Sequence, residues 1–237
     1  MNRVVIITGV GPGLGAALAR RFAREDFRVA LVARSPAVIE AVSGEISAAG
    51  SSALGVIADV SRPAEVAAAV NRVRVELGPV GVLIHNASSG LGGGLLATTP
   101  ETFEQAWRVA ALGGFVCARE TAPDMLASGA GAMLFTGATS SVRGGGWLAF
   151  SSAKFAVRGL VQSLARELWP RGVHVAHVVI DGLIAARRRG GAPQENEKEP
   201  ALDPDHIADA YWHLAMQDRS AWTLELDLRP HTEQFYV

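Results

Sequence analysis

Cysteine, tyrosine and excess charge of either sign are all scarce in this chain of 237 residues. The single cysteine, Cys117, excludes a disulfide framework and a cysteine-rich metal site, so we expect no metal. Basic and acidic residues number 22 and 23, and the formal net charge of −1 provides no basic field to attract nucleic acid or an anionic membrane. The only tyrosines, Tyr211 and Tyr236, lie near the C-terminal end.

Long apolar runs are also missing. The uncharged stretch over residues 80–100 contains His85, Asn86, serines and several glycines, so it is not the run of roughly 20 apolar residues that a membrane helix needs. The N-terminal residues lead directly into Val4–Ile7, which is too short for the apolar core of a signal peptide. We therefore expect a cytoplasmic protein with no membrane contact.

Apolar side chains, at 49% of residues, and glycine, at 26 positions, are abundant. Short apolar runs alternate with stretches whose apolar residues recur every three or four positions, which is typical of strands alternating with helices. The expected strands are Val4–Ile7, Val29–Ala33, Ala53–Ala58, Val82–His85, Ala132–Thr136, Val173–Val179 and a last one near Trp222–Leu226. The expected helices include Leu14–Arg24, Pro36–Ala49, Pro63–Leu77, Glu101–Ser128 and Phe150–Leu168.

Most of the expected strands are continuously apolar, which marks strands buried on both faces of a parallel sheet. Repeated strand–helix units predict one α/β domain over residues 1–237: a Rossmann-type, doubly wound parallel sheet of about seven strands with helices on both faces. Two irregular stretches, Ser88–Pro100 and Asp181–Pro204, follow strands at the edge where such sheets bind ligands. The second, at about 181–204, is either a solvated loop or a lid over the substrate. Residues 227–237 are expected to form a C-terminal tail.

A glycine-rich turn follows the first expected strand and opens the first helix. It reads Thr8-Gly9-Val10-Gly11-Pro12-Gly13-Leu14-Gly15. In this position the N-terminus of the helix directs unpaired N–H groups and a partial positive charge at whatever lies over the turn. The missing side chains of Gly9, Gly13 and Gly15 would let a pyrophosphate approach the backbone. The turn therefore predicts a dinucleotide site, with a purely structural turn as the alternative.

The spacing Thr-Gly-x-x-x-Gly-x-Gly resembles that of the short-chain dehydrogenase/reductase family, and the resemblance runs over nearly the whole chain. Ala58-Asp59-Val60, His85-Asn86-Ala87-Ser88 and Lys154 match further family motifs. The resemblance implies that Asp59 binds the adenine, Asn86 and Ala87 the adenosine ribose, and Lys154 the nicotinamide ribose. The full cofactor-binding set that it implies is Thr8, Gly9, Gly11, Gly13, Leu14, Gly15, Arg34, Asp59, Val60, Asn86, Ala87, Lys154 and Gly182.

The end of the second strand bears on the choice of cofactor. A carboxylate at this place would bind a ribose 2′-hydroxyl and repel a 2′-phosphate. Ala33 stands where NAD-preferring relatives carry an aspartate, and Arg34, which follows it, can pair with a phosphate or stack on adenine. The sequence therefore favours NADP(H) over NAD(H).

The catalytic residues of the family are largely replaced. The family uses Tyr-x-x-x-Lys on one helix face, where the ammonium lowers the pKa of the proton-donating phenol. The corresponding segment is Phe150-Ser151-Ser152-Ala153-Lys154, and Phe150 has the shape of the tyrosine without its proton. Ala110 aligns with the family's helix asparagine and Gly137 with its serine, while Asp181-Gly182 replaces Pro-Gly. Of the catalytic tetrad, Lys154 alone is kept.

Three interpretations stay open. In the first, the chain is an NAD(P)(H)-dependent oxidoreductase that acts on a small hydrophobic carbonyl compound or conjugated alkene. Its catalytic candidates are then Lys154 and Ser140, beside a non-protic Phe150, with Ser141, Ser151 or Asp181 as other possible acids. In the second, the chain has lost its chemistry and serves as a nucleotide-binding sensor or scaffold. In the third, it is a hydro-lyase or isomerase that uses the nucleotide structurally.

Two further features concern the interior and the assembly. His174 and His177 lie three positions apart on an expected strand, so they point to opposite faces and are expected to be satisfied interior or edge histidines rather than shared metal ligands. Helix Phe150–Leu168 is apolar on more than one side. With Glu101–Ser128 it predicts a four-helix contact between subunits, as the resemblance also implies. We therefore expect a homodimer or a homotetramer.

Overall fold

The computed structural model describes residues 1–90, 93–185 and 201–233. Seven strands in these ranges form one sheet in the order β3-β2-β1-β4-β5-β6-β9, and every neighbouring pair is parallel. The strands are β1 (Val4–Thr8), β2 (Arg28–Ala33), β3 (Ala53–Ile57), β4 (Val82–His85), β5 (Gly131–Thr136), β6 (Val173–Ile180) and β9 (Glu225–Leu228). A short separate pair joins β7 (Leu183–Ile184) to β8 (Ala201–Leu202). The predicted fold class is confirmed.

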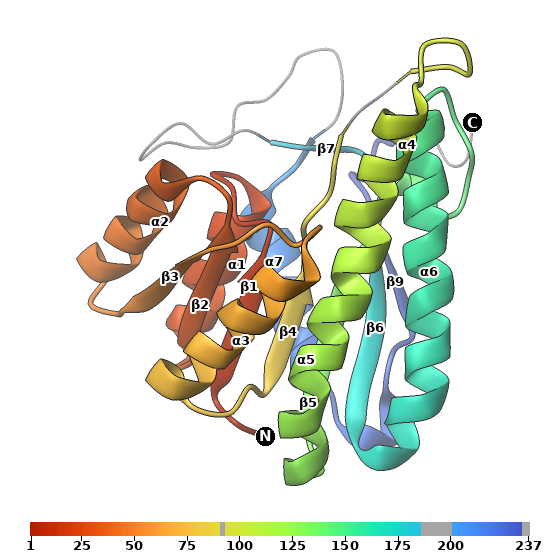
Figure 1. Ribbon diagram of the computed structural model, residues 1–237. Coiled ribbons are helices and arrows are strands. Elements are labelled where there is room, and N and C mark those ends of the chain that lie inside the picture. Colours follow the sequence, from red (N-terminus) through yellow and green to blue (C-terminus); the bar gives the residue numbers. More distant parts are fainter. Residues whose placement is uncertain (91–92, 186–200, 234–237) are drawn as a thin grey trace.

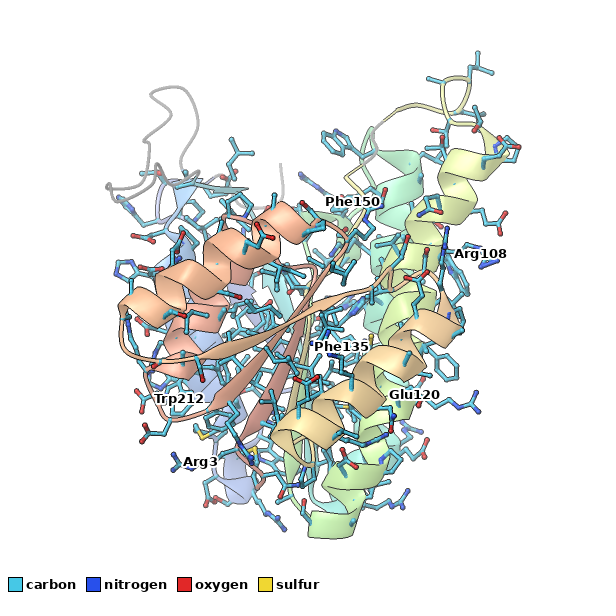
Figure 2. The ribbon with its side chains drawn as sticks, turned by 60° about the vertical axis from the view of Figure 1, so that its left-hand side comes forward. Arg3, Arg108, Glu120, Phe135, Phe150 and Trp212 are labelled. Carbon is cyan, nitrogen blue, oxygen red and sulfur yellow. The ribbon has the colours of Figure 1, made fainter. Side chains whose placement is uncertain are left out.

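Helices cover both faces of this sheet (Figure 1). One face, which we call the α6 face, packs against α3 (Pro63–Leu77), α4 (Pro100–Trp107), α5 (Gly113–Ser128) and α6 (Leu148–Leu168). The other, the α1 face, packs against α1 (Leu14–Ala23), α2 (Pro36–Ala48) and α7 (Pro204–Ala215). Figure 2 shows Phe135 inside the α6 face and Trp212 on the opposite side of the molecule.

The continuous burial of the strands explains why this layered arrangement forms. Every residue of β1 and of β6 is buried. Because successive side chains of a strand point to opposite faces, such runs lose all contact with water only when helices cover both sides of the sheet. None of the described helices combines the length and the apolarity needed to cross a bilayer.

The strand order also fixes where a ligand can bind. The chain runs from β1 outward to β2 and β3, and then returns to place β4, β5 and β6 on the other side of β1. The loops after β1 and β4 therefore leave the sheet in opposite directions and open a crevice between them. The glycine-rich turn follows β1, and Asn86 follows β4, so both predicted motifs lie at this crevice.

Some boundaries differ from those expected. A single helix is expected over Glu101–Ser128. The structure instead has α4, then a π-helical turn at Arg108–Leu112, then α5, because one turn takes an extra residue. The last strand, β9, begins at Glu225 and not near Trp222, whose ring stacks on His174. The expected tail, 227–237, begins inside β9, and residues 234–237 lie outside the described residues. Residues 186–200 of the expected lid also lie outside the described residues. Strands β7 and β8 lie at its two ends.

Candidate active site

The glycine-rich turn packs tightly against the loop after β4. Gly9 has φ +69°, and a Cβ there would lie 2.4 Å from the Cα of Ala87, so no side chain fits. A Cβ on Gly15 would lie 2.7 Å from the Cα of Val10. The side-chain amide of Asn86 donates to the carbonyl oxygen of Gly9 at 3.0 Å and ties the two loops together. Gly9 and Gly15 are thus required by the packing of the protein itself.

Gly11 and Gly13 differ from these two glycines because their missing side chains face open space. Helix α1 begins at Leu14, its N-cap is Gly13, and no side chain caps the first turn. That turn also contains no acidic residue, so its N–H groups and the positive end of the helix dipole stay available to an anion. This open cradle fits the diphosphate of a dinucleotide.

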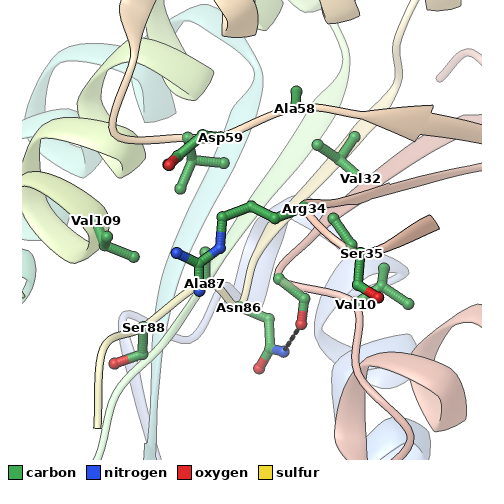
Figure 3. Close-up of a pocket in the computed structure, with 13 residues that line it drawn as sticks. Val10, Val32, Arg34, Ser35, Ala58, Asp59, Asn86, Ala87, Ser88 and Val109 are labelled. Atoms are coloured by element: carbon green, nitrogen blue, oxygen red, sulfur yellow. Dashed lines mark hydrogen bonds between the residues drawn. The ribbon is translucent and has the colours of Figure 1, made fainter. Parts of the chain in front are cut away.

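A cleft of about 590 Å³ continues from the turn along the carboxyl ends of β2, β3 and β4 (Figure 3). Its lining consists of residues from these strand ends, the turn and the π-helical segment: Gly9, Val10, Val32, Ala33, Arg34, Ser35, Ala58, Asp59, Val60, Asn86, Ala87, Ser88 and Val109. This lining of small and apolar residues with a few polar groups suits the adenosine half of a dinucleotide.

Two charged side chains, from the ends of the neighbouring strands β2 and β3, line the cleft. Arg34 is exposed and reaches across toward Asn86 and Ala87 (Figure 3), and none of the described residues forms a salt bridge with it. Partial burial raises the pKa of Asp59, but hydrogen bonds from the Ser61 N–H and hydroxyl, with the charges of Arg34 and Arg62, hold it below its usual value. The cleft therefore offers one fixed anion and one cation to a ligand.

His85 connects β1 to the π-helical segment beneath the cleft. Its Nδ1 lies 3.0 Å from the Thr8 hydroxyl, and its Nε2 lies 3.0 Å from the carbonyl oxygen of Ala110. Since a carbonyl can only accept, we assign the proton to Nε2, and Nδ1 accepts from Thr8. Burial and the nearby charge of Lys154 lower the pKa of His85 to about 4. The ring is therefore neutral near pH 7.

Lys154 lies on α6, deep on the same face of the sheet. Its Nζ donates to the carbonyl oxygen of Thr136 at 2.7 Å and lies 5.5 Å from the centroid of the Phe150 ring. Burial lowers the pKa of Lys154 to about 8, since a low-dielectric site disfavours the ammonium. The half-buried Phe150 supplies an aromatic face to this cation and no proton.

The hydroxyl-bearing residues near the end of β5 have mostly local partners. The Ser141 hydroxyl accepts from the Ala138 N–H at 3.1 Å, and the Thr139 hydroxyl donates to the carboxylate of Asp181. Asp181 is also paired with Arg229 at 3.0 Å, so its carboxylate acts as an acceptor. Ser140 lies half-buried in the same turn, which packs on α6.

The predicted cofactor residues fall into three groups. Six line the cleft: Gly9, Arg34, Asp59, Val60, Asn86 and Ala87. Thr8, Gly11, Gly13, Leu14 and Gly15 build the turn beside it, and Lys154 lies beneath Phe150. Gly182 is not in this lining, and a Cβ there would lie 3.0 Å from Leu202 and from Pro230. The predicted set lacks the other lining residues, namely Val10, Val32, Ala33, Ser35, Ala58, Ser88 and Val109. Val109 carried no signal in the sequence, because it lies in the π-helical turn.

Comparison with known proteins agrees with this geometry. A family model described as short chain dehydrogenase matches residues 3–193. A meso-2,3-butanediol dehydrogenase of Serratia marcescens is 31% identical over 229 residues, which cover 92% of this chain and 89% of the relative. A 3-oxoacyl-[acyl-carrier-protein] reductase of Mycobacterium tuberculosis is 30% identical over 229 residues, covering 93% and 88%.

Solved structures give the same result. A short-chain dehydrogenase from Rhodopseudomonas palustris superposes with a TM-score of 0.84 at 38% identity, covering 96% of this chain and 98% of that one. A metagenomic short-chain oxidoreductase in complex with NADP superposes with a TM-score of 0.83 at 30% identity, covering 96% and 97%. The chain belongs to the short-chain dehydrogenase/reductase family of oxidoreductases.

Proposed function

We propose that this chain is an NADP(H)-dependent oxidoreductase whose substrate is a small hydrophobic carbonyl compound, the corresponding alcohol, or a conjugated alkene. The observation that carries the proposal is the cleft that joins the uncapped glycine turn to Arg34. When bound, the cofactor supplies or accepts hydride. The protein's own residues must hold it, exclude water and move one proton.

The preference for NADP(H) rests on the end of β2. Ala33 removes the carboxylate that would repel a 2′-phosphate, and the exposed guanidinium of Arg34 can pair with that group. A solved relative in complex with NADP supports the same choice. We assign the turn from Thr8 to Gly15 to the diphosphate, and Asp59 and Asn86 to the adenosine half.

Lys154 is the residue of the family's tetrad that we keep in a catalytic role. Burial lowers its pKa to about 8, so the ammonium remains mostly charged at neutral pH. It also suits a contact with the nicotinamide ribose. Ser140 is the proposed hydroxyl contact for the substrate, and Phe150 is an apolar wall.

The substrate class follows from exposed apolar side chains near the expected substrate loops. Trp147 contacts Phe150 with ring centroids 6.0 Å apart, and Gly93 forms a β-bridge with Trp147. Leu95, Leu96, Leu183 and Ile184 also expose apolar surface, while Leu91 lies outside the described residues. Such surroundings favour a hydrophobic molecule, and the 181–204 segment remains our proposed substrate loop.

Assembly and location complete the proposal. Four aromatic side chains of α4, α5 and α6 are partly exposed, namely Phe103, Trp107, Phe115 and Phe155. Contact between these helices in two copies would bury them, so we propose a homodimer or a homotetramer. We keep the prediction that the protein works in the cytoplasm.

Calorimetric titration with NADPH and NADH tests the function directly. We expect tighter binding of NADPH, and Arg34→Ala should weaken it by roughly 10- to 150-fold, since hydrogen bonds to a charged group are worth about 1.5–3 kcal/mol. NADH affinity should stay nearly constant in this variant. Arg24→Ala, another exposed arginine, is the matched control. Failure to bind either dinucleotide at millimolar concentration would overturn the proposal.

A further inference from the structure

His177 is a buried histidine held by a carboxylate on the α6 face. Its Nδ1 lies 2.9 Å from the Oε2 atom of Glu225 on β9. Glu225 also accepts two hydrogen bonds of 2.7 Å from Arg158 on α6. Because a carboxylate accepts, Nδ1 carries the proton and Nε2 presents a lone pair. Glu225 therefore fixes both the tautomer and the orientation of the ring.

The Nε2 atom of His177 is a buried polar atom with no hydrogen-bond partner among the described residues. The side chain is only 1% exposed, and leaving such an atom unpaired costs about 1–3 kcal/mol. His174, on the same strand, has both ring nitrogens near carbonyl oxygens, 3.0 Å from that of Leu214 and 2.8 Å from that of Thr223. A neutral ring can donate to only one of these two carbonyls, so both histidines are interior, as expected, and each has one ring nitrogen that donates a hydrogen bond.

The unpaired nitrogen occupies the place where residue 137 would carry a side chain. A Cβ on Gly137 would lie 2.4 Å from Nε2 and 2.7 Å from Cε1 of His177, so a serine at 137 cannot coexist with this ring position. Residue 137 aligns with the serine whose hydroxyl contacts the substrate oxygen in the family. The polar atom at this position therefore comes from β6 instead of from the loop after β5.

We propose that the His177–Glu225 pair is the acid–base group of this chain, with Nε2 taking the proton of an alcohol substrate and returning it in the reverse reaction. The proposal rests on the oxidoreductase function above. In the oxidation, the O–H bond breaks and its proton forms the Nε2–H bond. The electron pair left on oxygen forms the C=O bond. At the same time the C–H bond breaks, and its hydrogen leaves with both electrons, as hydride, to an oxidised nicotinamide dinucleotide. Glu225 stabilises the resulting imidazolium.

The charges that face the ring keep it in the form that this role needs. Burial lowers the pKa of His177, the hydrogen bond and charge of Glu225 raise it, and the cations Lys154 and Arg158 lower it, with a net lowering. The imidazole is therefore neutral at neutral pH and ready to accept a proton. Oxidation should fail only as the pH falls through this lowered pKa, because protonation then blocks Nε2.

Nitrogen NMR of isotope-labelled histidine in the NADP⁺ complex tests the proposal without any need for turnover. We expect His177 to be protonated at Nδ1 and bare at Nε2, and the Nε2 resonance to move on addition of cyclohexanol. The signals of His174 should not move. A proton on Nε2, or an unmoved resonance across a series of aliphatic and aromatic alcohols, would overturn the proposal.

Turnover supplies the second test. His177→Gln and Glu225→Gln should bind NADP⁺ like the unmodified chain but lower kcat for alcohol oxidation by roughly 10²–10⁴, with loss of the acid limb of the pH profile. His174→Gln, the control on the opposite face of β6, should keep the profile. Unchanged kcat and pH profile in both site variants would refute the role of the pair. Absence of NADP⁺ binding in the unmodified chain would instead refute the proposed function.

Discussion

Restoring a phenol at position 150 is the sharpest test of how the site is arranged. In Phe150→Tyr, the ring already stands over the Lys154 ammonium, with its centroid 5.5 Å from Nζ. At an effective dielectric constant of about 20, an ammonium roughly 5 Å from a phenolate oxygen favours the phenolate by about 3 kcal/mol. Phe150 is half-buried, so desolvation opposes only part of this effect. The pKa of the introduced phenol should therefore fall below its usual value and suit general acid catalysis.

The expected gain follows from the magnitude of general acid–base catalysis. A correctly placed acid is worth roughly 10²–10⁴ in rate. If the His177–Glu225 pair already moves the proton, Phe150→Tyr should give little gain in the unmodified chain and a large one in the His177→Gln background. The assay is the loss of NADPH absorbance with a panel of hydrophobic aldehydes and ketones, measured for the two single variants and the double variant.

Two controls decide whether the gain comes from the phenol at this site. Phe155→Tyr adds the same hydroxyl to the same helix outside the site and keeps the aromatic ring that we assign to the subunit contact, so it should not change the rate. Lys154→Met in the Phe150→Tyr background should remove the gain because the cation is gone. A double variant that binds NADPH normally and shows no rescue would refute the placement of Phe150 beside the reacting oxygen.

The remaining predictions concern the scaffold of the site. Gly9→Ala should abolish dinucleotide binding in calorimetry or destabilise the fold in urea, since its Cβ would lie 2.4 Å from a backbone atom. In the control Gly11→Ala, the added Cβ meets no atom within 4 Å, so this variant should fold normally. Burial holds the pKa of His85 at about 4 instead of 6.5. The free energy of unfolding in urea should therefore fall by about 3 kcal/mol as the pH is lowered from about 6.5 toward 4. His85→Asn should reduce that loss. Phe115→Glu should shift sedimentation toward the monomer without weakening NADPH binding.

Much of the fold could be predicted from local patterns. The continuously apolar runs of β1 and β6 required a covered parallel sheet, and a strand followed by the glycine turn and a helix required a crevice above β1. The extra residue of the π-helical turn at Arg108–Leu112 could not be predicted, because apolar periodicity does not distinguish it from an α-helix. The stacking of Trp222 on His174, a contact distant in sequence, could not be predicted either.

The site divides in a similar way. Asp59, Asn86 and the turn could be predicted because short motifs fix their chemistry near the strand ends. The partners of the histidines could not, since His85 meets Ala110 and His177 meets Glu225 only through the packing of β4, β6 and β9. The unpaired Nε2 atom of His177 could not be predicted either, because its position depends on Gly137 in a neighbouring loop.

The departures from the family pattern are better explained as one rearranged site than as separate losses. Where the helix asparagine is replaced by Ala110, the backbone carbonyl accepts a hydrogen bond from His85. Where the serine is replaced by Gly137, the ring of His177 fills the space. Where proline is replaced by Asp181, its carboxylate accepts from the Thr139 hydroxyl. Loss of function at random would leave cavities or unrelated surface at these three points. The buried or hydrogen-bonded polar group beside each replaced residue supports the proposal that His177 and Glu225 carry the acid–base chemistry.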